Sequence, residues 1–578
     1  MSCPTSTPPV ANRRDLARSK RVQAADIAYY RPHATHHNNC EESSYPYVGN
    51  YSKGLQHDAL GDVVPASYQS LLNALNLKTP SAFEAVQLGP GGKKLTNPQA
   101  GLAFDLQGPD PQSVTQPPAP RIDSARNSSE MAELYWMALA RDVHFADYAS
   151  HPLIGQAVTS LNTEFSDFRG PKVAGQVTRQ TLFRGIFPGE VTGPYLSQFL
   201  LKGTSDPRLP AGQGRSTRDG LITYGDLKIN QRQVTVQPGI NYLTDFPWWL
   251  EVQNGADKRG MDAIDTTARR FVRNLRDLGE RVHFDNVADH FFNAALILLH
   301  EVPGDQTNGT GVVARDREFP DDMLNPYGAY LKQAPFVTYG PPHVLRLVWE
   351  VLTRALQAVW FQKWFVHRRL RPEEFGGRID NHLTGRRTYW QINGEILASL
   401  QYGQLSPYFP ASLGTYLLPQ AFPEGAPTHP AYGAGHATGA GACATILKAF
   451  FNEDARIENP VQASADGLSL VAYTGPGWAE MTVGSELNKL AGNIALGRNA
   501  AGVHWRTDYD QSLLLGEQVA IGLLQEQSIL YNEGGGFMLR KFDGTCVKIW
   551  DGQVVPCDPP PPPTTTVTAT VTTTTSTV

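Results

Sequence analysis

Two segments of this 578-residue chain place basic side chains or histidines beside prolines and glycines. The first, KWFVHRRLRPEEFGGR, begins at Lys363 and has Arg371 directly before a proline. The second, HPAYGAGHATGAGA, begins at His429 and contains Gly435 and His436. A glycine-rich turn before a helix can offer backbone N–H groups to an anion, or it can let helices approach closely. These segments alone leave both roles open.

A third segment, ALGRNAAGVHWRTDYD, contains Arg498, His504 and Asp508. Each residue has an ordinary explanation, because basic residues suit helix C-termini and single histidines are commonly hydrogen-bonded in a core. Asp508 either orients a histidine or forms a structural salt bridge. However, Lys363 lies on an apolar and aromatic stretch, and a buried lysine needs an anion. A buried Lys363 therefore favours an anion nearby, while each segment taken alone is a weak signal.

Helical patterns dominate the elements that must position these residues. Residues 285–302 are apolar on most faces, with Asp285 expected as the N-cap, and two prolines open the amphipathic stretch 341–367. Two further helices are expected from residue 485 and over 509–531. Strand signals are sparse, although RQVTVQPG at 232–239 suits part of a hairpin. The sequence predicts a mainly α fold made of helix bundles, with few short strands.

Composition shifts divide the chain into four predicted regions. They are an irregular N-terminal arm (1–55), a helical N-terminal half (56–335), a helical-bundle half with the anion site (336–540) and a low-complexity Pro/Thr tail expected to be disordered (541–578). The arm contains His33, His36, His37 and Cys40. This group suits a transition metal, but a solvated arm is the favoured interpretation.

Bulk properties exclude several classes of function. A net charge of −5 argues against a nucleic-acid partner, and 41% hydrophobic residues are ordinary for a globular protein. No apolar run approaches the ~20 residues of a membrane span. The first residues lack the apolar region of a secretory signal, so a cytoplasmic protein or one exported by a non-standard route is expected. The five cysteines are too few for a disulfide framework, but Cys546 with Cys557 and Cys3 with Cys40 are candidate pairs.

Taken together, the three segments resemble the active-site motifs of the vanadium-dependent haloperoxidases and the related acid phosphatases. Seven residues separate Lys363 from Arg371, as in the algal bromoperoxidase branch, whereas the phosphatases usually have six. Further stretches that resemble this branch are ELYWMALARDVHFADY, LFRGIFPGEVTGPYLSQFLL and YLTDFPWWLEVQNG, so the resemblance covers most of 45–535. It implies the family's helical-bundle architecture and a homo-oligomer. It also implies an enzyme that oxidises halide, bromide first, with hydrogen peroxide to hypohalous acid, which halogenates small organic compounds.

The resemblance implies a vanadate cofactor and a role for each motif residue. The cofactor-binding residues are expected to be Lys363, Arg371, Gly435, Arg498 and His504, with His504 as the metal ligand. His436 is expected to take a proton from peroxide, while Lys363 polarises a peroxide oxygen. Trp360 and His429 are expected to tune halide preference. Some relatives hold a structural calcium, for which Asp316, Asp321 and Asp322 are candidates here beside the alternative of a solvated loop.

Two positions depart from the family pattern and keep alternatives open. Ala434 stands where the family normally has a serine whose hydroxyl donates to vanadate, and Gly497 stands where serine is frequent. One alternative is an acid phosphatase in which His504 attacks phosphorus and His436 protonates the leaving group. The other is a non-catalytic oxyanion-binding protein, which the loss of the serine donor at position 434 suggests.

Overall fold

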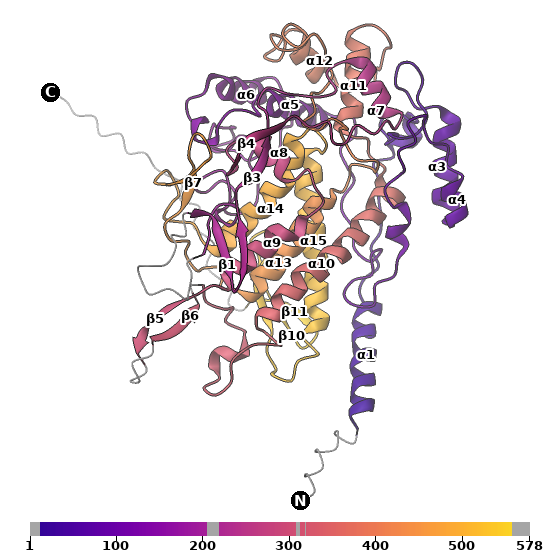
Figure 1. Cartoon of the computed structure of the whole chain (residues 1–578). Helices are drawn as coiled ribbons and strands as arrows, with labels where there is room; N and C mark the ends of the chain where they lie inside the picture. The colour runs from indigo at the N-terminus through magenta and orange to yellow at the C-terminus, as the bar shows by residue number, and fades with distance from the viewer. Residues whose placement is uncertain (1–11, 205–218, 308–312, 318, 558–578) are drawn as a thin grey trace, which may run out of the picture.

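The computed structural model describes residues 12–204, 219–307, 313–317 and 319–557, with 301–307 and 313–317 as backbone only. Long helices pack side by side in the centre, and short strands lie around them (Figure 1). This arrangement confirms the mainly α prediction. Within the described ranges, no helix combines the length and apolarity needed to cross a membrane. The α-helices are α1 (Arg13–Tyr29), α2 (Glu41–Ser44), α3 (Pro65–Leu77), α4 (Pro80–Glu84), α5 (Ala125–Leu139), α6 (Pro152–Thr163), α7 (Phe246–Gln253), α8 (Leu275–Arg281), α9 (Val287–Leu298), α10 (Pro341–Phe361), α11 (Pro372–Leu383), α12 (Gly394–Gln401), α13 (Gly435–Phe450), α14 (Val483–Ala500) and α15 (Arg506–Gln527).

Helix α13 forms the centre of the bundle, and every one of its residues is buried. It packs against α9, α10, α14 and α15. A Cβ at Gly441 would lie 2.2 Å from the carbonyl oxygen of Leu513, and one at Gly516 would lie 2.0 Å from that of Thr438. The close approach of α13 and α15 therefore requires glycine on both helices. Beyond the first turn of α13, the small residues therefore serve close helix packing, which is one of the two roles considered for them.

Several helix ends meet in one region of the bundle. Helix α10 continues into the π-helical turn η6 (Gln362–His367), and α11 begins immediately after Arg371. The starts of α13 and α15 and the end of α14 complete the set. Pro341 and Pro372 are the first residues of α10 and α11, where proline's fixed φ and missing N–H suit a helix start. The sequence motifs lie at these ends.

The strands are short and pair locally in small antiparallel sheets. They form the pairs β1–β2, β3–β4, β5–β6 and β7–β8 and the three-stranded sheet β11–β10–β9. The predicted strand at 232–239 is confirmed as β3. Its partner β4 comes after α7 in the sequence, so β3 and β4 do not form a tight hairpin. The strands are β1 (Leu221–Tyr224), β2 (Leu227–Asn230), β3 (Gln233–Val236), β4 (Ile264–Arg270), β5 (Glu301–Thr307), β6 (Val313–Arg317), β7 (Val461–Ala463), β8 (Leu470–Ala472), β9 (Phe537–Arg540), β10 (Cys546–Trp550) and β11 (Gln553–Pro556).

Three sequence expectations need correction. The N-terminal arm is not irregular throughout, because α1 forms from strong helix formers although it buries no residue and extends away from the body (Figure 1). Residues 546–556 are not part of a disordered tail, because β10 and β11 pair there, while residues 558–578 lie outside the described part. Asp285 does not cap α9; Asn286 occupies the N-cap position, and its side chain donates to Asp289 and does not cap a backbone N–H of the helix. The other domain boundaries stay a prediction.

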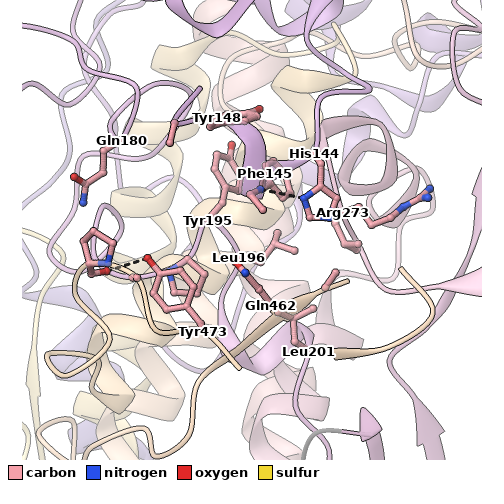
Figure 2. Close-up of a pocket in the computed structure, with 18 of the residues that line it drawn as sticks. His144, Phe145, Tyr148, Gln180, Tyr195, Leu196, Leu201, Arg273, Gln462 and Tyr473 are labelled. Atoms are coloured by element: carbon pink, nitrogen blue, oxygen red, sulfur yellow. Dashed lines mark hydrogen bonds between the residues drawn. The ribbon is translucent and has the colours of Figure 1, made fainter. Parts of the chain in front are cut away.

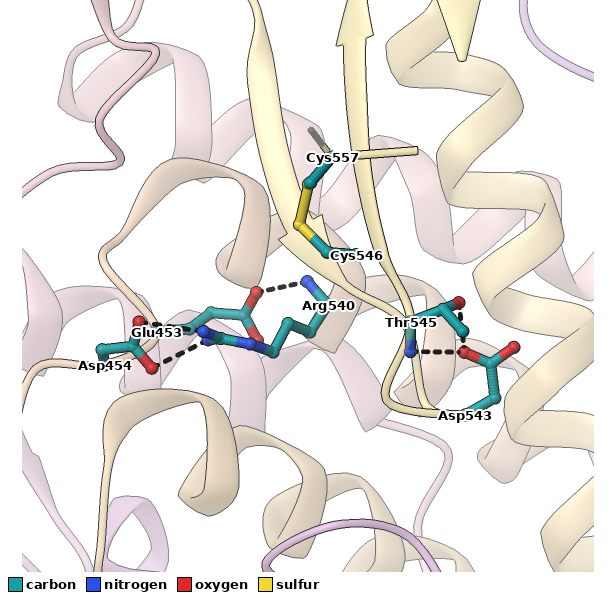
Figure 3. The surroundings of a disulfide bond; sticks show 7 residues. All are labelled: Glu453, Asp454, Arg540, Asp543, Thr545, Cys546 and Cys557. Carbon is teal, nitrogen blue, oxygen red and sulfur yellow. Dashed lines mark hydrogen bonds and ion pairs between the residues drawn. A yellow bond between two sulfur atoms is a disulfide. The ribbon is translucent and has the colours of Figure 1, made fainter. Parts of the chain in front are cut away.

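The predicted pairing of Cys546 with Cys557 is confirmed as a disulfide with a Cα–Cα distance of 5.4 Å (Figure 3). It joins the start of β10 to the residue after β11. On the neighbouring strand β9, Arg540 forms an ion pair with Asp454 at 2.8 Å. Its backbone N–H donates to the carboxylate of Glu453. Cys3 lies outside the described residues, so its pairing with Cys40 stays a prediction.

Candidate functional site

Three basic side chains from different helix ends are buried within the region where the motifs meet. Lys363 in η6 donates to the carbonyls of Pro430 at 2.8 Å and Ala431 at 3.1 Å. Arg371, which precedes α11, donates to the carbonyl of His429 at 2.9 Å. Two of the three motif segments therefore contact each other directly.

The third segment joins them through Arg371, whose Nη1 donates to the carbonyl of Val503 at 2.8 Å and lies 2.9 Å from His504 Nε2. Arg498, in the last turn of α14, donates from Nη1 to the carbonyl of Val282 at 2.7 Å, while its buried Nε has no partner in the described structure. The predicted convergence of three distant segments is thus present in the fold.

Lys363, Arg371 and Arg498 are buried without a direct ion-pair partner in the described part of the chain. Within the described residues, none of Lys363, Arg371 and Arg498 forms an ion pair with a carboxylate, and at most 5% of each is exposed. Burial, followed by the nearby Arg371, lowers the pKa of Lys363 well below its usual value. Burial and Arg498 lower the pKa of Arg371 to about 10. A group of buried charges of one sign is costly until an anion binds among them.

His504 has a fixed orientation. Its Nδ1 lies 2.8 Å from Asp508 Oδ2, so Nδ1 carries the proton and Nε2 presents its lone pair. The other carboxylate oxygen of Asp508 accepts from Arg369 at 3.1 Å. Burial and then Arg371 lower the pKa of His504 well below its usual value, which keeps the ring neutral. Asp508 therefore orients His504 and pairs with Arg369 at the same time, so both roles considered for it apply.

The glycine-rich turn ends at the start of α13. Ala434 is the N-cap residue and supplies no side-chain hydrogen bond to the helix. Its own N–H donates to the hydroxyl of Ser512 at 2.8 Å. The N–H groups of the first helical turn, beginning at Gly435, have no partner within their own helix and carry the positive end of its dipole. A Cβ on Gly435 would lie 3.2 Å from the ring of Trp360, so a larger residue would crowd this position.

His436 projects from the first turn of α13 with one nitrogen unused. A hydrogen bond to the backbone of Phe284 holds the ring, while its buried Nε2 has no hydrogen-bond partner within the described ranges. Burial and then Arg498 lower the pKa of His436 well below its usual value, so the ring is a neutral base. Asp285 Oδ1 lies 3.9 Å from that Nε2. Asp285, expected as a helix cap, lies instead beside His436, a position that its sequence context did not indicate.

The two residues expected to tune the halide lie together. The ring centroids of Trp360 and His429 are 4.9 Å apart, and Lys363 Nζ lies 5.7 Å from the Trp360 ring. Trp360 donates to the carbonyl of Thr96 at 3.1 Å, which fixes its ring. His429 Nδ1 lies 3.0 Å from Arg371 Nη2. Both rings therefore border the basic cluster.

A separate cavity of about 490 Å³ lies between residues 144–273, from the chain between α5 and α8, and residues 462–476 around β7 and β8 (Figure 2). Phe145 and Tyr195 line it and stack with centroids 4.0 Å apart. None of the predicted site residues lines this cavity. It is therefore not the space in which the three motif segments meet.

The structure does not bring together the predicted calcium ligands among its described side chains. Asp321 accepts from Asn325, and Asp322 accepts from the backbone of Leu324. The side chain of Asp316 lies outside the described part, so calcium stays a prediction. In the N-terminal arm, His36 contacts the carbonyl of Gln112 at 3.0 Å and packs against the ring of Phe361. The described side chains of the arm do not form a group that could hold a metal ion.

Comparison with known proteins identifies the family. Residues 351–532 match the model of the VCPO second helical-bundle domain. The vanadium-dependent bromoperoxidase of Corallina pilulifera is 38% identical over 600 residues, covering 92% of this chain and 97% of that protein. The corresponding protein of Ascophyllum nodosum is 34% identical over 529 residues, covering 87% of this chain and 86% of that protein.

A solved structure gives the same result. The homohexameric second vanadate-dependent bromoperoxidase of Ascophyllum nodosum superposes with a TM-score of 0.82 at 25% identity, covering 96% of both chains. Similarity therefore extends over nearly the whole chain and includes the helical bundle that carries the basic cluster. The chain belongs to the vanadium-dependent haloperoxidase family, in its algal-type bromoperoxidase branch.

Proposed function

We propose that this protein is a vanadium-dependent haloperoxidase that oxidises bromide with hydrogen peroxide to hypobromous acid, which then halogenates organic compounds. The relatives named as bromoperoxidases over most of the chain support the activity. One structural observation carries the assignment to a site. Lys363, Arg371 and Arg498 converge as buried cations without a carboxylate partner among the described residues.

The residues present suit a vanadate ion. A tetrahedral oxyanion needs several donors that replace water, and guanidinium groups can each bind two of its oxygens. Among the residues that the structure describes, the buried Nε of Arg498 has no partner and no side chain caps the first N–H groups of α13, so donors remain for such an anion. His504 Nε2 presents a lone pair beside the same cations, as a metal ligand must.

Bound vanadate would supply Lewis acidity that makes peroxide an electrophile toward halide without a change in the oxidation state of the metal. We assign His504 as the ligand, kept in its Nδ1–H form by Asp508. Lys363, Arg371, Arg498 and the N–H of Gly435 would hold the oxygens. Lys363 would also polarise a peroxide oxygen.

His436 is the assigned acid–base group. Its ring is held through the backbone of Phe284, and the unpartnered Nε2 of the neutral imidazole can accept a proton from hydrogen peroxide. Asp285 lies close enough to stabilise the imidazolium that forms. The proton can then leave with the hypohalous acid or with water.

Bromide is the assigned halide because His429, typical of bromoperoxidases in this branch, contacts Arg371 at the edge of the cluster. Trp360 is instead typical of the chloroperoxidases, so slower oxidation of chloride is expected. The two rings pack against each other, which supports a shared contribution to the halide position.

The assay that tests this function uses protein stripped of oxyanions and then supplied with vanadate, bromide and hydrogen peroxide. We expect bromination of an organic dye that depends on vanadate, with iodide also oxidised and chloride slower. Hydrolysis of a phosphate monoester without bromination would instead indicate an acid phosphatase. Oxyanion binding with neither activity would indicate a binding protein.

The hexameric relative supports a homo-oligomeric assembly for this chain. We therefore expect sedimentation of the native protein at a multiple of its 63.4 kDa chain mass. Small organic molecules, halide and peroxide are the assigned reaction partners. The compartment stays a prediction.

A further inference from the structure

Beside the oxyanion site, three metal-binding side chains come together around the C-terminal end of α8. They are Asp262, Glu280 and His283, and one ligand atom from each lies within 4.8 Å of the others. His283 Nδ1 is 3.5 Å from Glu280 Oε2 and 3.7 Å from Asp262 Oδ1. Two ligands bound at ~2.1 Å to one tetrahedral ion are about 3.4 Å apart. The spacing therefore matches ligands that share an ion.

The other nitrogen of His283 is already fixed. Nε2 lies 2.9 Å from Glu424 Oε1, and the ring stacks on Phe422 with centroids 3.8 Å apart and an interplanar angle of 2°. A histidine that binds a metal usually donates its second N–H to a carboxylate, which sets both the tautomer and the ring direction. The ring of His283 is thus oriented with Nδ1 toward the two carboxylates.

Some buried polar atoms of this group have no hydrogen-bond partner among the described residues. They include His283 Nδ1 and Asp262 Oδ1, and the His283 side chain is only 10% exposed. Three carboxylates, including Glu424, surround the single imidazole. Against the effect of burial, Glu280 and Glu424 raise the pKa of His283 to about 9, so a proton balances one of these charges when no metal is bound. A divalent cation would displace that proton, balance two charges and also satisfy the unpaired atoms.

We propose that Asp262, Glu280 and His283 bind one divalent transition-metal ion, Zn²⁺ or Mn²⁺, with Glu424 orienting the imidazole. A nitrogen ligand with two carboxylates suits these ions, whereas Ca²⁺ takes six to eight oxygen ligands. The side chains of Asp262 and Glu280 are 14% and 9% exposed, so the ion can enter from solvent and keep water in its remaining positions.

The location gives this ion a structural task beyond the proposed oxidation of halide. The residues on either side of His283 hold two groups of the oxyanion site, because Val282 accepts from Arg498 and Phe284 holds His436. Phe422 lies between His283 and Arg498, whose Cζ is 5.4 Å from the ring centroid. An ion on His283 would therefore fix the backbone that positions both groups.

The test measures metal binding by the whole protein without vanadate, so it does not depend on haloperoxidase activity. Protein treated with EDTA and dialysed is titrated calorimetrically with ZnCl₂ and, separately, MnCl₂, and its metal content is measured after dialysis. We expect one ion per chain with micromolar or tighter affinity, and an altered Mn²⁺ electron paramagnetic resonance spectrum. Failure of the wild-type protein to bind either ion would overturn the proposal.

Variants assign the ion to this site. Glu280→Gln should weaken binding at least tenfold, and Glu424→Gln should weaken it about 10–100-fold by releasing the imidazole. Glu251→Gln is the matched control, because Glu251 is 58% exposed and pairs with Lys258 outside the group. Equal metal affinity in folded Glu280→Gln and wild-type protein would contradict the assignment. Asp262→Asn provides the same comparison if Glu280→Gln does not fold.

Discussion

Replacing Ala434 by serine tests how this chain holds an oxyanion without the hydroxyl that its family normally supplies. Ala434 is 3% exposed and has φ −84° and ψ 126°, the extended geometry of an N-cap residue. No side chain caps α13 at present. A serine at this position would have its hydroxyl directly at the positive end of the helix dipole, where the anion is expected to bind.

The expected magnitude has two separable parts. A hydrogen bond to a charged group is worth about 1.5–3 kcal/mol, and 1.4 kcal/mol corresponds to a tenfold change in affinity. The dissociation constant for vanadate should therefore fall about 10–100-fold in Ala434→Ser. Without vanadate, the new N-cap should raise the free energy of unfolding by about 1 kcal/mol.

Vanadate affinity is measured by calorimetry on the stripped protein and by recovery of bromination as vanadate is added. Ala440→Ser serves as the control, because Ala440 is fully buried in the same helix but lies beyond its first turn. The control should not bind vanadate more tightly. Unchanged or weaker affinity in Ala434→Ser, with the fold intact, would refute the reasoning and would mean that another donor already fills the place.

Two further predictions follow from buried hydrogen bonds. Asp508→Asn should weaken vanadate binding about 10–100-fold in the same titration, because Asp508 holds the Nδ1 proton of His504. The control Asp510→Asn should have little effect on vanadate binding, since burial already raises the pKa of Asp510 to about 7. Equal losses of affinity in the two variants would contradict this role of Asp508. Burial lowers the pKa of His343 to about 4, and its Nδ1 accepts a hydrogen bond from the Tyr339 N–H. The His343 ring therefore stays neutral in the folded protein, whereas the same ring in the unfolded chain binds a proton below about pH 6.5. The free energy of unfolding from denaturant titrations should therefore fall as the pH drops from about 6.5 to 4, and His343→Asn should reduce that slope; an unchanged slope would exclude His343 as its source.

The sequence predicted the motif positions well because each lies where a long, strongly patterned helix begins or ends. Lys363 follows the apolar face of α10, and Arg498 lies in the last turn of α14, so helix periodicity alone gives their local setting. Their convergence is a tertiary property that no local pattern encodes. It was expected only because a buried lysine needs an anion and because the spacing resembled a known family.

Other features had no local signal. The carbonyls that hold Lys363 and Arg498 belong to Pro430 and Val282, and any residue type has a carbonyl. Asp285 has the residue type and spacing of an N-cap, and only the packing of α9 against α13 reveals its place beside His436. Helix α1 was missed because a helix that buries no residue has no clear apolar face.

The most direct test of the central claim is a crystal structure of the stripped protein soaked with vanadate. The account predicts one vanadium atom bonded to His504 Nε2, with its oxygens contacting Lys363, Arg371, Arg498 and the N–H of Gly435. Vanadate bound elsewhere, or none at these residues at saturating concentration, would contradict the account.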